Sequence, residues 1–241
     1  MSEAALFTGV PAEGLDLLAR AAGGASWEWI QGRAHDHARF VRGPVQDLCA
    51  DLHDEFGDAH VYRLHRSPKF WAQQVAVFHR TRDVGFRLEL SGEGLVVAGG
   101  WWTARSWHRE PFRAAAASRS NGSRLERILD VLSTRGWSID GESLVRVPPP
   151  YPPDHPHADL LRWRTLDVHR SLGAPRWLRA SRALREVRAR MRELSPLVDW
   201  LTDVVPERPA RPGSRSRSPG PVTPGRRSGV GLAAKPIDAG P

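Results

Sequence analysis

The chain has 241 residues, a hydrophobic content of 40% and a formal net charge of +8 at neutral pH. A chain of this length can bury a full core without disulfides or metals. Its N-terminus has no basic segment before an apolar stretch, which argues against a signal peptide, and no apolar run reaches the ~20 residues that span a bilayer. We therefore expect a soluble protein without membrane association.

The positive charge is concentrated at the C-terminal end. Residues 206–241 hold seven of the 35 basic and two of the 27 acidic side chains, and so carry +5 of the net +8. Their Pro, Gly, Ser and Arg bury too little apolar surface to offset chain entropy, so we predict a disordered tail after a single domain at 1–205. Arg-Ser tracts can follow a nucleic-acid backbone, but the tail has no aromatic residue for base stacking. Nucleic-acid binding is therefore a weak alternative, confined to the tail.

Cys49 is the only cysteine, so no intrachain disulfide can form and we expect a reducing, cytoplasmic compartment. It lies among Val45, Leu48, Leu52 and Phe56, whose spacing is that of one helix face. We interpret Cys49 as a small core residue rather than a nucleophile.

Helical periodicity dominates the first 56 residues. Pro11 opens one helix, a second begins near Ser26, and the apolar stripe through Cys49 predicts a third that ends at Phe56. Arg42-Gly43-Pro44 is predicted to break or kink the chain between the second and the third helix.

After Gly57 the period changes to two, which is typical of β-strands. We predict strands at 60–64, 74–78, 86–90, 95–98, 144–147 and 166–168. The turn Ser91-Gly92-Glu93-Gly94 joins two of them into a hairpin with one apolar and one charged face. Gly99-Gly100 at the strand end marks a bulge or a close approach of backbone or ligand.

Further helices are predicted at 106–118, 123–135, 175–194 and 196–204. Together these elements predict an α+β fold. We expect a mainly antiparallel sheet of about five or six strands, with helices on one face and at both ends.

A series of short motifs follows in a recognisable order along the chain. They are Phe7-Thr8-Gly9, Trp27-Glu28-Trp29-Ile30, Arg63 and Arg66 before Lys69-Phe70, Gly99-Gly100-Trp101, Pro149-Pro150-Tyr151, Asp154-His155-Pro156 and Leu160-Leu161-Arg162. In this order they resemble the bacterial family called domain of unknown function 2461, over residues 6–173, with the C-terminal helices at 175–205 outside that core. The resemblance implies a shared fold and carries no activity with it.

The chain departs from the family pattern in its most polar stretch. Ser67 and Trp71 stand where the family has Asp and Ser, and Gln73-Gln74 replaces an Asp-Lys pair. Ala25-Ser26 replaces a pair of Asn. If that stretch does chemistry in relatives, this chain has lost it, so we expect a non-enzymatic or degenerate member.

Basic side chains on the predicted strands can converge on one anion, which Arg binds in bidentate fashion. The predicted ligand-binding set is Arg63, Arg66, Lys69, Arg87, Gly99, Gly100, Trp101 and Tyr151. Our leading hypothesis is non-enzymatic binding of a small anionic ligand or of a protein partner. The competing interpretation is a solvated sheet face on which these cations pair with Glu89 and nearby Asp residues.

The segment Asp154-His155-Pro156-His157 predicts a second kind of site. With Asp159, the carboxylates and imidazoles of Asp154, His155 and His157 can ligate a divalent metal, which would support a metal-assisted hydrolase. The competing interpretation is that an Asp caps the following helix while His155 braces the turn.

Histidines at positions 35, 37, 53, 60, 65 and 79 are a further source of acid–base groups. No nucleophile-elbow, zinc-protease, phosphate-loop or dinucleotide fingerprint accompanies them, so we expect no cofactor and leave open whether the protein is an enzyme.

Overall fold

A computed structural model describes residues 7–62, 71–103 and 105–206. The chain divides into two units, residues 1–208 and 209–241. Nearly all of the predicted tail, 207–241, lies outside the described residues, so its disorder and the domain boundary at 205 stay predictions.

The first unit alternates helical and strand segments. Its helices are α1 (Ala12–Ala22), α2 (Trp27–Gly32), α3 (Ala34–His37), α4 (Gly43–Phe56), α5 (Ser106–Ala117), α6 (Arg119–Thr134), α7 (Ala158–Leu161) and α8 (Arg182–Val204), with a π-helical turn η1 (Ala38–Arg42) and a 3-10 turn η3 (Arg176–Arg179). Its strands are β1 (Ala59–Val61), β2 (Gln73–His79), β3 (Val84–Ser91), β4 (Gly94–Trp101), β5 (Ser138–Asp140) and β6 (Leu166–Ser171).

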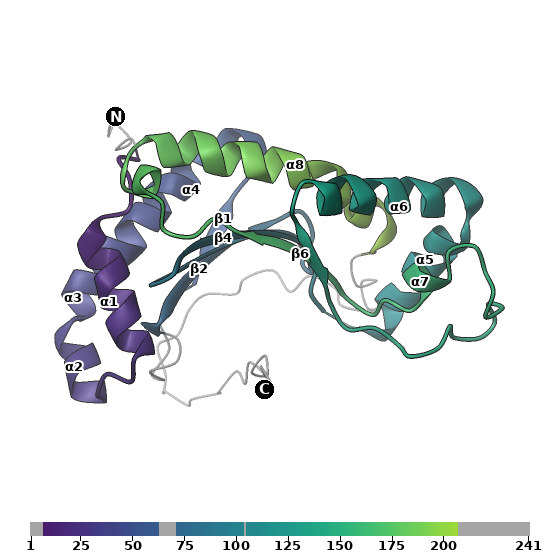
Figure 1. Cartoon of the computed structure of the whole chain (residues 1–241), viewed down its shortest axis with the longest axis horizontal. Helices are drawn as coiled ribbons and strands as arrows, with labels where there is room; N and C mark the ends of the chain where they lie inside the picture. Colours follow the sequence, from purple (N-terminus) through teal and green to yellow (C-terminus); the bar gives the residue numbers. More distant parts are fainter. Residues whose placement is uncertain (1–6, 63–70, 104, 207–241) are drawn as a thin grey trace, which may run out of the picture. The chain divides into compact units, whose positions relative to one another are not determined.

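These strands form one six-stranded sheet in the order β1-β2-β3-β4-β6-β5 (Figure 1). Every neighbouring pair is antiparallel, which confirms the predicted α+β class. The hairpin of β3 and β4 is also confirmed, since Ser91 pairs with Gly94 across the turn. The strands at the two edges, β1 and β5, have three residues each.

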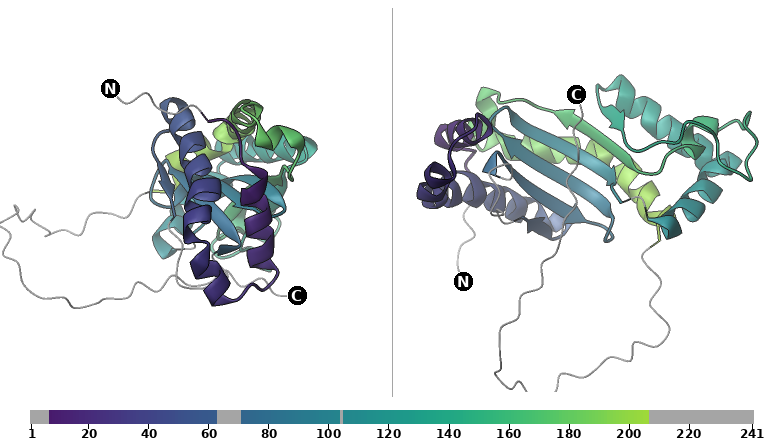
Figure 2. Two further views of the ribbon diagram at one scale, coloured as in Figure 1. Left: turned by 90° about the vertical axis from the view of Figure 1, so that its left-hand side faces the viewer. Right: turned by 90° about the horizontal axis from the view of Figure 1, so that it is seen from below.

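Helices cover one face of this sheet. α8 packs on β3 and β4, and α4 packs on β1 and β2 (Figure 1). Phe86, Leu88, Val97 and Val168 point toward these helices and are at most 1% exposed. Seen from below, the strands lie in front of α8, and no helix of the described residues covers them (Figure 2, right). One face therefore makes the core and the other stays open.

The helix α8 runs unbroken through Pro196, where we predicted a boundary between two helices. A proline inside a helix removes one backbone hydrogen bond. Here the helix nevertheless continues because Leu194, Leu197, Val198 and Leu201, on both sides of the proline, are fully buried against the sheet.

The predicted strand at 144–147 is wrong. Val145 is 90% exposed, and pairing in this region is limited to an isolated bridge between Ser143 and Trp163. The edge strand is instead Ser138–Asp140, which pairs with β6 through Ile139 and Val168. A short apolar run becomes a strand only where a neighbouring strand offers backbone partners.

Of the break or kink predicted at Arg42-Gly43-Pro44, the break is wrong, and the kink stays a prediction. The chain passes from η1 directly into α4, with Pro44 in the first turn of that helix. The N–H of Gly43 donates to Ala38 O in η1, so the helical hydrogen bonding continues up to the residue before Pro44. Among the helices of the described residues, none has both the length and the apolar character needed to cross a bilayer.

Two glycines in β4 set how closely its neighbours approach. A Cβ on Gly99 would lie 3.0 Å from a methyl of Val198 and 3.2 Å from one of Leu194, so this residue lets α8 pack against the strand. A Cβ on Gly100 would lie 2.1 Å from the carbonyl oxygen of Leu166 in β6. Gly99-Gly100 thus marks a close approach of helix and backbone rather than a bulge in the ladder.

Substituting Gly100→Ala should destabilise the fold by about 2 kcal/mol or more, because the clashing atom belongs to the backbone of β6. Chemical denaturation measures this. Gly32→Ala is the control, since a Cβ there meets no atom within 4 Å. Equal stability of the two variants would contradict the close approach.

His37, the last residue of α3, is 1% exposed. Its ring lies 5.2 Å from that of Trp71, and its Nε2 has no hydrogen-bond partner among the described residues. Burial, aided by the charge of Arg42, lowers the pKa of His37 from 6.5 to about 4. The folded protein therefore holds this imidazole neutral.

We expect the free energy of unfolding to fall as pH drops from 6.5 toward 4, because the unfolded chain then binds a proton that folded His37 does not. The loss should reach about 3 kcal/mol at most. His37→Phe should flatten this part of the profile in denaturant titrations, whereas the exposed His35→Gln should not. A profile unchanged by His37→Phe would assign the acid sensitivity elsewhere.

Candidate functional site

Polar side chains meet on the open face of the sheet, around Asp167 of β6. Arg87 of β3 donates from Nη2 to Asp167 Oδ2 (3.1 Å), and the indole Nε1 of Trp102, just after β4, donates to Oδ1 (2.6 Å). The guanidinium carbon of Arg87 lies 5.6 Å from the centre of the Trp102 ring. One carboxylate thus fixes a cation and an aromatic ring beside each other.

The strand register explains why these residues meet. Arg87 pairs with Ala98, and Asp167 pairs with Gly100, so β4 lies between the two charged residues. Because Ala98 and Gly100 have little or no side chain, Arg87 can reach across β4 to Asp167. The second glycine of the Gly99-Gly100 pair therefore also makes room for the ion pair on the open face.

His169 and Asp140 extend this cluster toward the β5 edge. His169 Nδ1 lies 3.6 Å from Asp167 Oδ2 and 3.7 Å from Asp140 Oδ2. The side chains of Arg87 and Asp167 are 20% and 21% exposed, whereas Asp140 is 65% exposed. The cluster thus places a guanidinium, an imidazole, two carboxylates and an indole together on this face of the sheet.

We call Arg87, Trp102, Asp140, Asp167 and His169 the open-face cluster. Of these five residues, the predicted ligand-binding set contained Arg87 alone. The alternation of Leu166, Asp167, Val168 and His169 did predict a strand with a polar side. What it could not supply was the neighbour of that strand, which places residue 167 beside residue 100.

The other predicted ligand residues that the structure describes are not members of the open-face cluster. Arg63, Arg66 and Lys69 lie outside the described residues. Trp101 is fully buried, and its indole donates to Thr103 O and to His108 Nδ1. Gly99 faces α8. Trp102 is half-buried and lies on the opposite face from Trp101, because adjacent strand residues point to opposite faces.

Tyr151 lies beside His155, with ring centres 6.2 Å apart. The neighbouring His157 is buried, and its Nδ1 forms a hydrogen bond of 2.8 Å with Glu126 Oε1 of α6. The backbone N–H of His157 donates to His155 Nδ1 (3.1 Å). These contacts brace the Pro-rich turn against α6.

The four predicted metal ligands do not converge. Asp159 pairs with Arg162, and Asp154 is exposed to solvent. In the part of the chain that the structure describes, no group of three or more His, Cys, Asp or Glu side chains could hold a metal ion. The geometry of this segment therefore gives the metal-assisted hydrolase no support.

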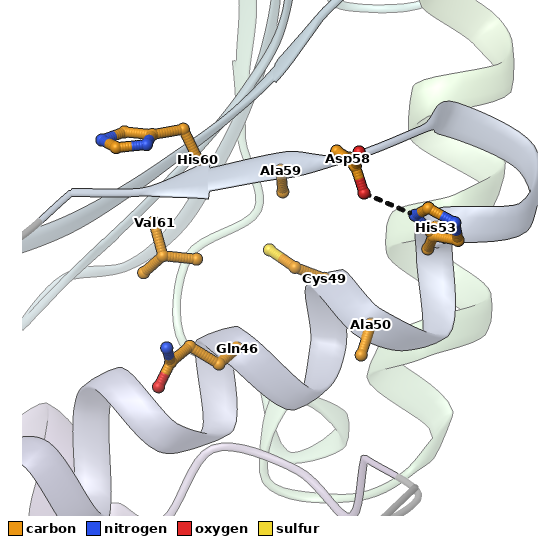
Figure 3. Close-up of a pocket in the computed structure, with 8 residues that line it drawn as sticks. All are labelled: Gln46, Cys49, Ala50, His53, Asp58, Ala59, His60 and Val61. Carbon is orange, nitrogen blue, oxygen red and sulfur yellow. Dashed lines mark ion pairs between the residues drawn. The ribbon is translucent and has the colours of Figure 1, made fainter. Parts of the chain in front are cut away.

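A separate surface pocket of about 500 Å³ lies between α4 and β1 (Figure 3). His53 and Asp58 form an ion pair at its rim, with Nδ1 and Oδ1 3.1 Å apart, and the sulfur of Cys49 points into it, on the side away from His53. Burial raises the pKa of the Cys49 thiol to about 12. A thiol this weakly acidic does not serve as a nucleophile at neutral pH, although Cys, His and Asp all line the pocket.

Alkylation of native Cys49 by iodoacetamide at neutral pH should be slower than that of a free thiol by about three orders of magnitude, following its thiolate fraction. Unfolding in urea should restore the ordinary rate. Mass spectrometry reports this residue directly because the chain has a single cysteine. Fast labelling of the folded protein would show an activated thiol.

The fold and the open-face cluster describe an α+β protein with one helix-covered sheet face and one face that presents paired polar groups. A family model, "Conserved hypothetical protein (DUF2461)", matches residues 15–200. The chain belongs to this family, and the match includes most of α8, which we had placed outside the family-like core. No curated protein and no solved structure matches the chain.

Proposed function

We propose that this protein binds a small ligand carrying an anionic group on the open face of its sheet, with Arg87 as the cationic contact. The observation that carries the proposal is that Asp167 orients both Arg87 and the Trp102 ring on an uncovered surface. A side chain held in one orientation loses little entropy on binding.

The pairing with Asp167 leaves Arg87 able to bind an anion. A guanidinium carries several N–H donors, and its contact with Asp167 uses one of them. The Nε of Arg87 is buried, so an anion would reach the guanidinium through its terminal nitrogens. The carboxylate also accepts from Trp102, so its charge is shared between two donors. Asp167 therefore positions the guanidinium and also weakens its attraction for a second anion.

The Trp102 ring suggests that the ligand also carries a planar group. It lies on the same open face as Arg87 and stacks against the guanidinium, and an indole face suits a planar group. Phosphates and carboxylates attached to a flat ring, as in nucleotides or aromatic acids, fit this combination better than inorganic phosphate. The single buried cysteine supports a cytoplasmic location, and the family resemblance a bacterial source; cell fractionation tests the location.

The test is a calorimetric titration with inorganic phosphate, a nucleoside monophosphate and benzoate. We expect Arg87→Gln to lower affinity about tenfold or more, because it removes the cation. Asp167→Asn should raise affinity about three- to tenfold, because it removes the competing charge at similar shape. This opposite pair of effects is the signature of the proposed site.

Arg119→Gln is the matched control, since Arg119 is an exposed cation at the start of α6, away from the sheet face. It should leave the affinity unchanged. Absence of heat with every probe, or equal losses in Arg87→Gln and Arg119→Gln, would refute the proposed function. Circular dichroism of each variant separates a lost contact from a lost fold.

A further inference from the structure

A second surface, away from the open-face cluster, has the features of a protein-binding groove. It lies between α6 and α8, with a volume of about 390 Å³. Ile128 and Leu132 of α6 and Pro196 of α8 supply apolar lining. Val131 also lines it and is 49% exposed, which is unusual among the large hydrophobic side chains of the described residues. We call this feature the α6–α8 groove.

The rim of the α6–α8 groove is basic. It is formed by Arg124 and Arg127 of α6, Arg135 at the end of α6 and Arg192 of α8. The lining contains a single carboxylate, that of Glu193. By the 3.6-residue period, residues 124, 127, 128 and 131 of α6 lie on one helix face, and Arg135, which caps the end of α6, continues it. The acidic residues of α6, positions 126 and 130, fall on other sides of the helix. Cations and apolar side chains thus share one stripe.

The charges of this rim are largely uncompensated. Glu193 already accepts from Trp137 Nε1 (2.9 Å) and Arg190 Nη1 (2.6 Å), and Arg192 is paired with Glu55. Within the described residues, Arg124, Arg127 and Arg135 have no carboxylate at ion-pair distance. Within the described residues, these three cations beside an apolar floor therefore form no close ion pair, although the charge of Arg135 helps to lower the pKa of Glu193.

We propose that the α6–α8 groove binds an acidic amphipathic helix of a partner protein. A groove between two helices accepts a third helix through its i, i+3, i+4 and i+7 apolar side chains. Arg124 and Arg135 are separated by about 16 Å along the α6 axis, the length of about three helical turns. Asp or Glu residues flanking the apolar stripe of such a helix would meet the arginines of the rim.

A nucleic-acid occupant fits this groove less well. Its lining contains no aromatic side chain on which a base could stack, and exposed Val131 stands among the cations. A phosphate backbone gains nothing from covering that apolar surface, whereas a leucine of a partner helix does. Charge and apolar area together therefore favour the acidic helix.

The probe is a fluorescein-labelled synthetic helix with Leu at i, i+3, i+4 and i+7 and Glu at the flanking positions, followed by fluorescence anisotropy. We expect saturable binding that Arg124→Glu, Arg135→Glu and Val131→Ser each weaken about fivefold or more. Arg119→Glu, a charge reversal on α6 outside the groove, should change the affinity by less than about twofold.

Three results would overturn this proposal. The first is a peptide with the same composition in scrambled order binding equally well, which would mean attraction by charge alone. The second is tighter binding of a single-stranded oligonucleotide through the same arginines. The third is a concentration-dependent dimer abolished by Val131→Ser, which would make a second copy the occupant. Arg87→Gln should leave peptide binding intact, so either proposed site can be refuted without refuting the other.

Discussion

The packing of α8 on β4 at Gly99 is the contact on which the rest of the molecule depends. Leu194 and Val198 come within van der Waals reach of the strand only because residue 99 has no side chain. The buried face of α8 then closes the core over β3 and β4. Because the helices gather on this face, the polar side chains of the same strands point to the uncovered face, where the open-face cluster forms.

Much of the fold could be predicted because its signals are local. The β3–β4 hairpin follows from strict alternation around Ser91–Gly94, and α1 follows from periodicity after Pro11. Two of the failures share a cause. Strand 144–147 and the helix boundary at Pro196 were inferred from local composition, whereas the structure is decided there by distant partners. A residue can adopt an element that its own sequence disfavours when tertiary burial outweighs the local cost.

The candidate site was harder to predict than the fold, for the same reason. Arg87 was recognisable as a cation on a strand, but its partner Asp167 lies 80 positions away in the chain. Only the antiparallel pairing of β4 with β6 brings the two together, across Gly100. Trp102 was distinguishable from Trp101 only once the side of the sheet facing α8 was known. Strand order, which no single segment encodes, is therefore what assembles the open-face cluster.

An open sheet has two edge strands, and an edge strand with unpaired backbone groups can pair with strands of other molecules and cause aggregation. The dimensions of β1 and β5 counter this hazard. Each has three residues, against seven or eight in β2, β3 and β4, and β5 ends at the exposed carboxylate of Asp140. So short an edge gives an incoming strand few backbone hydrogen bonds. The short edges therefore give other copies of the protein few backbone groups with which to extend the sheet.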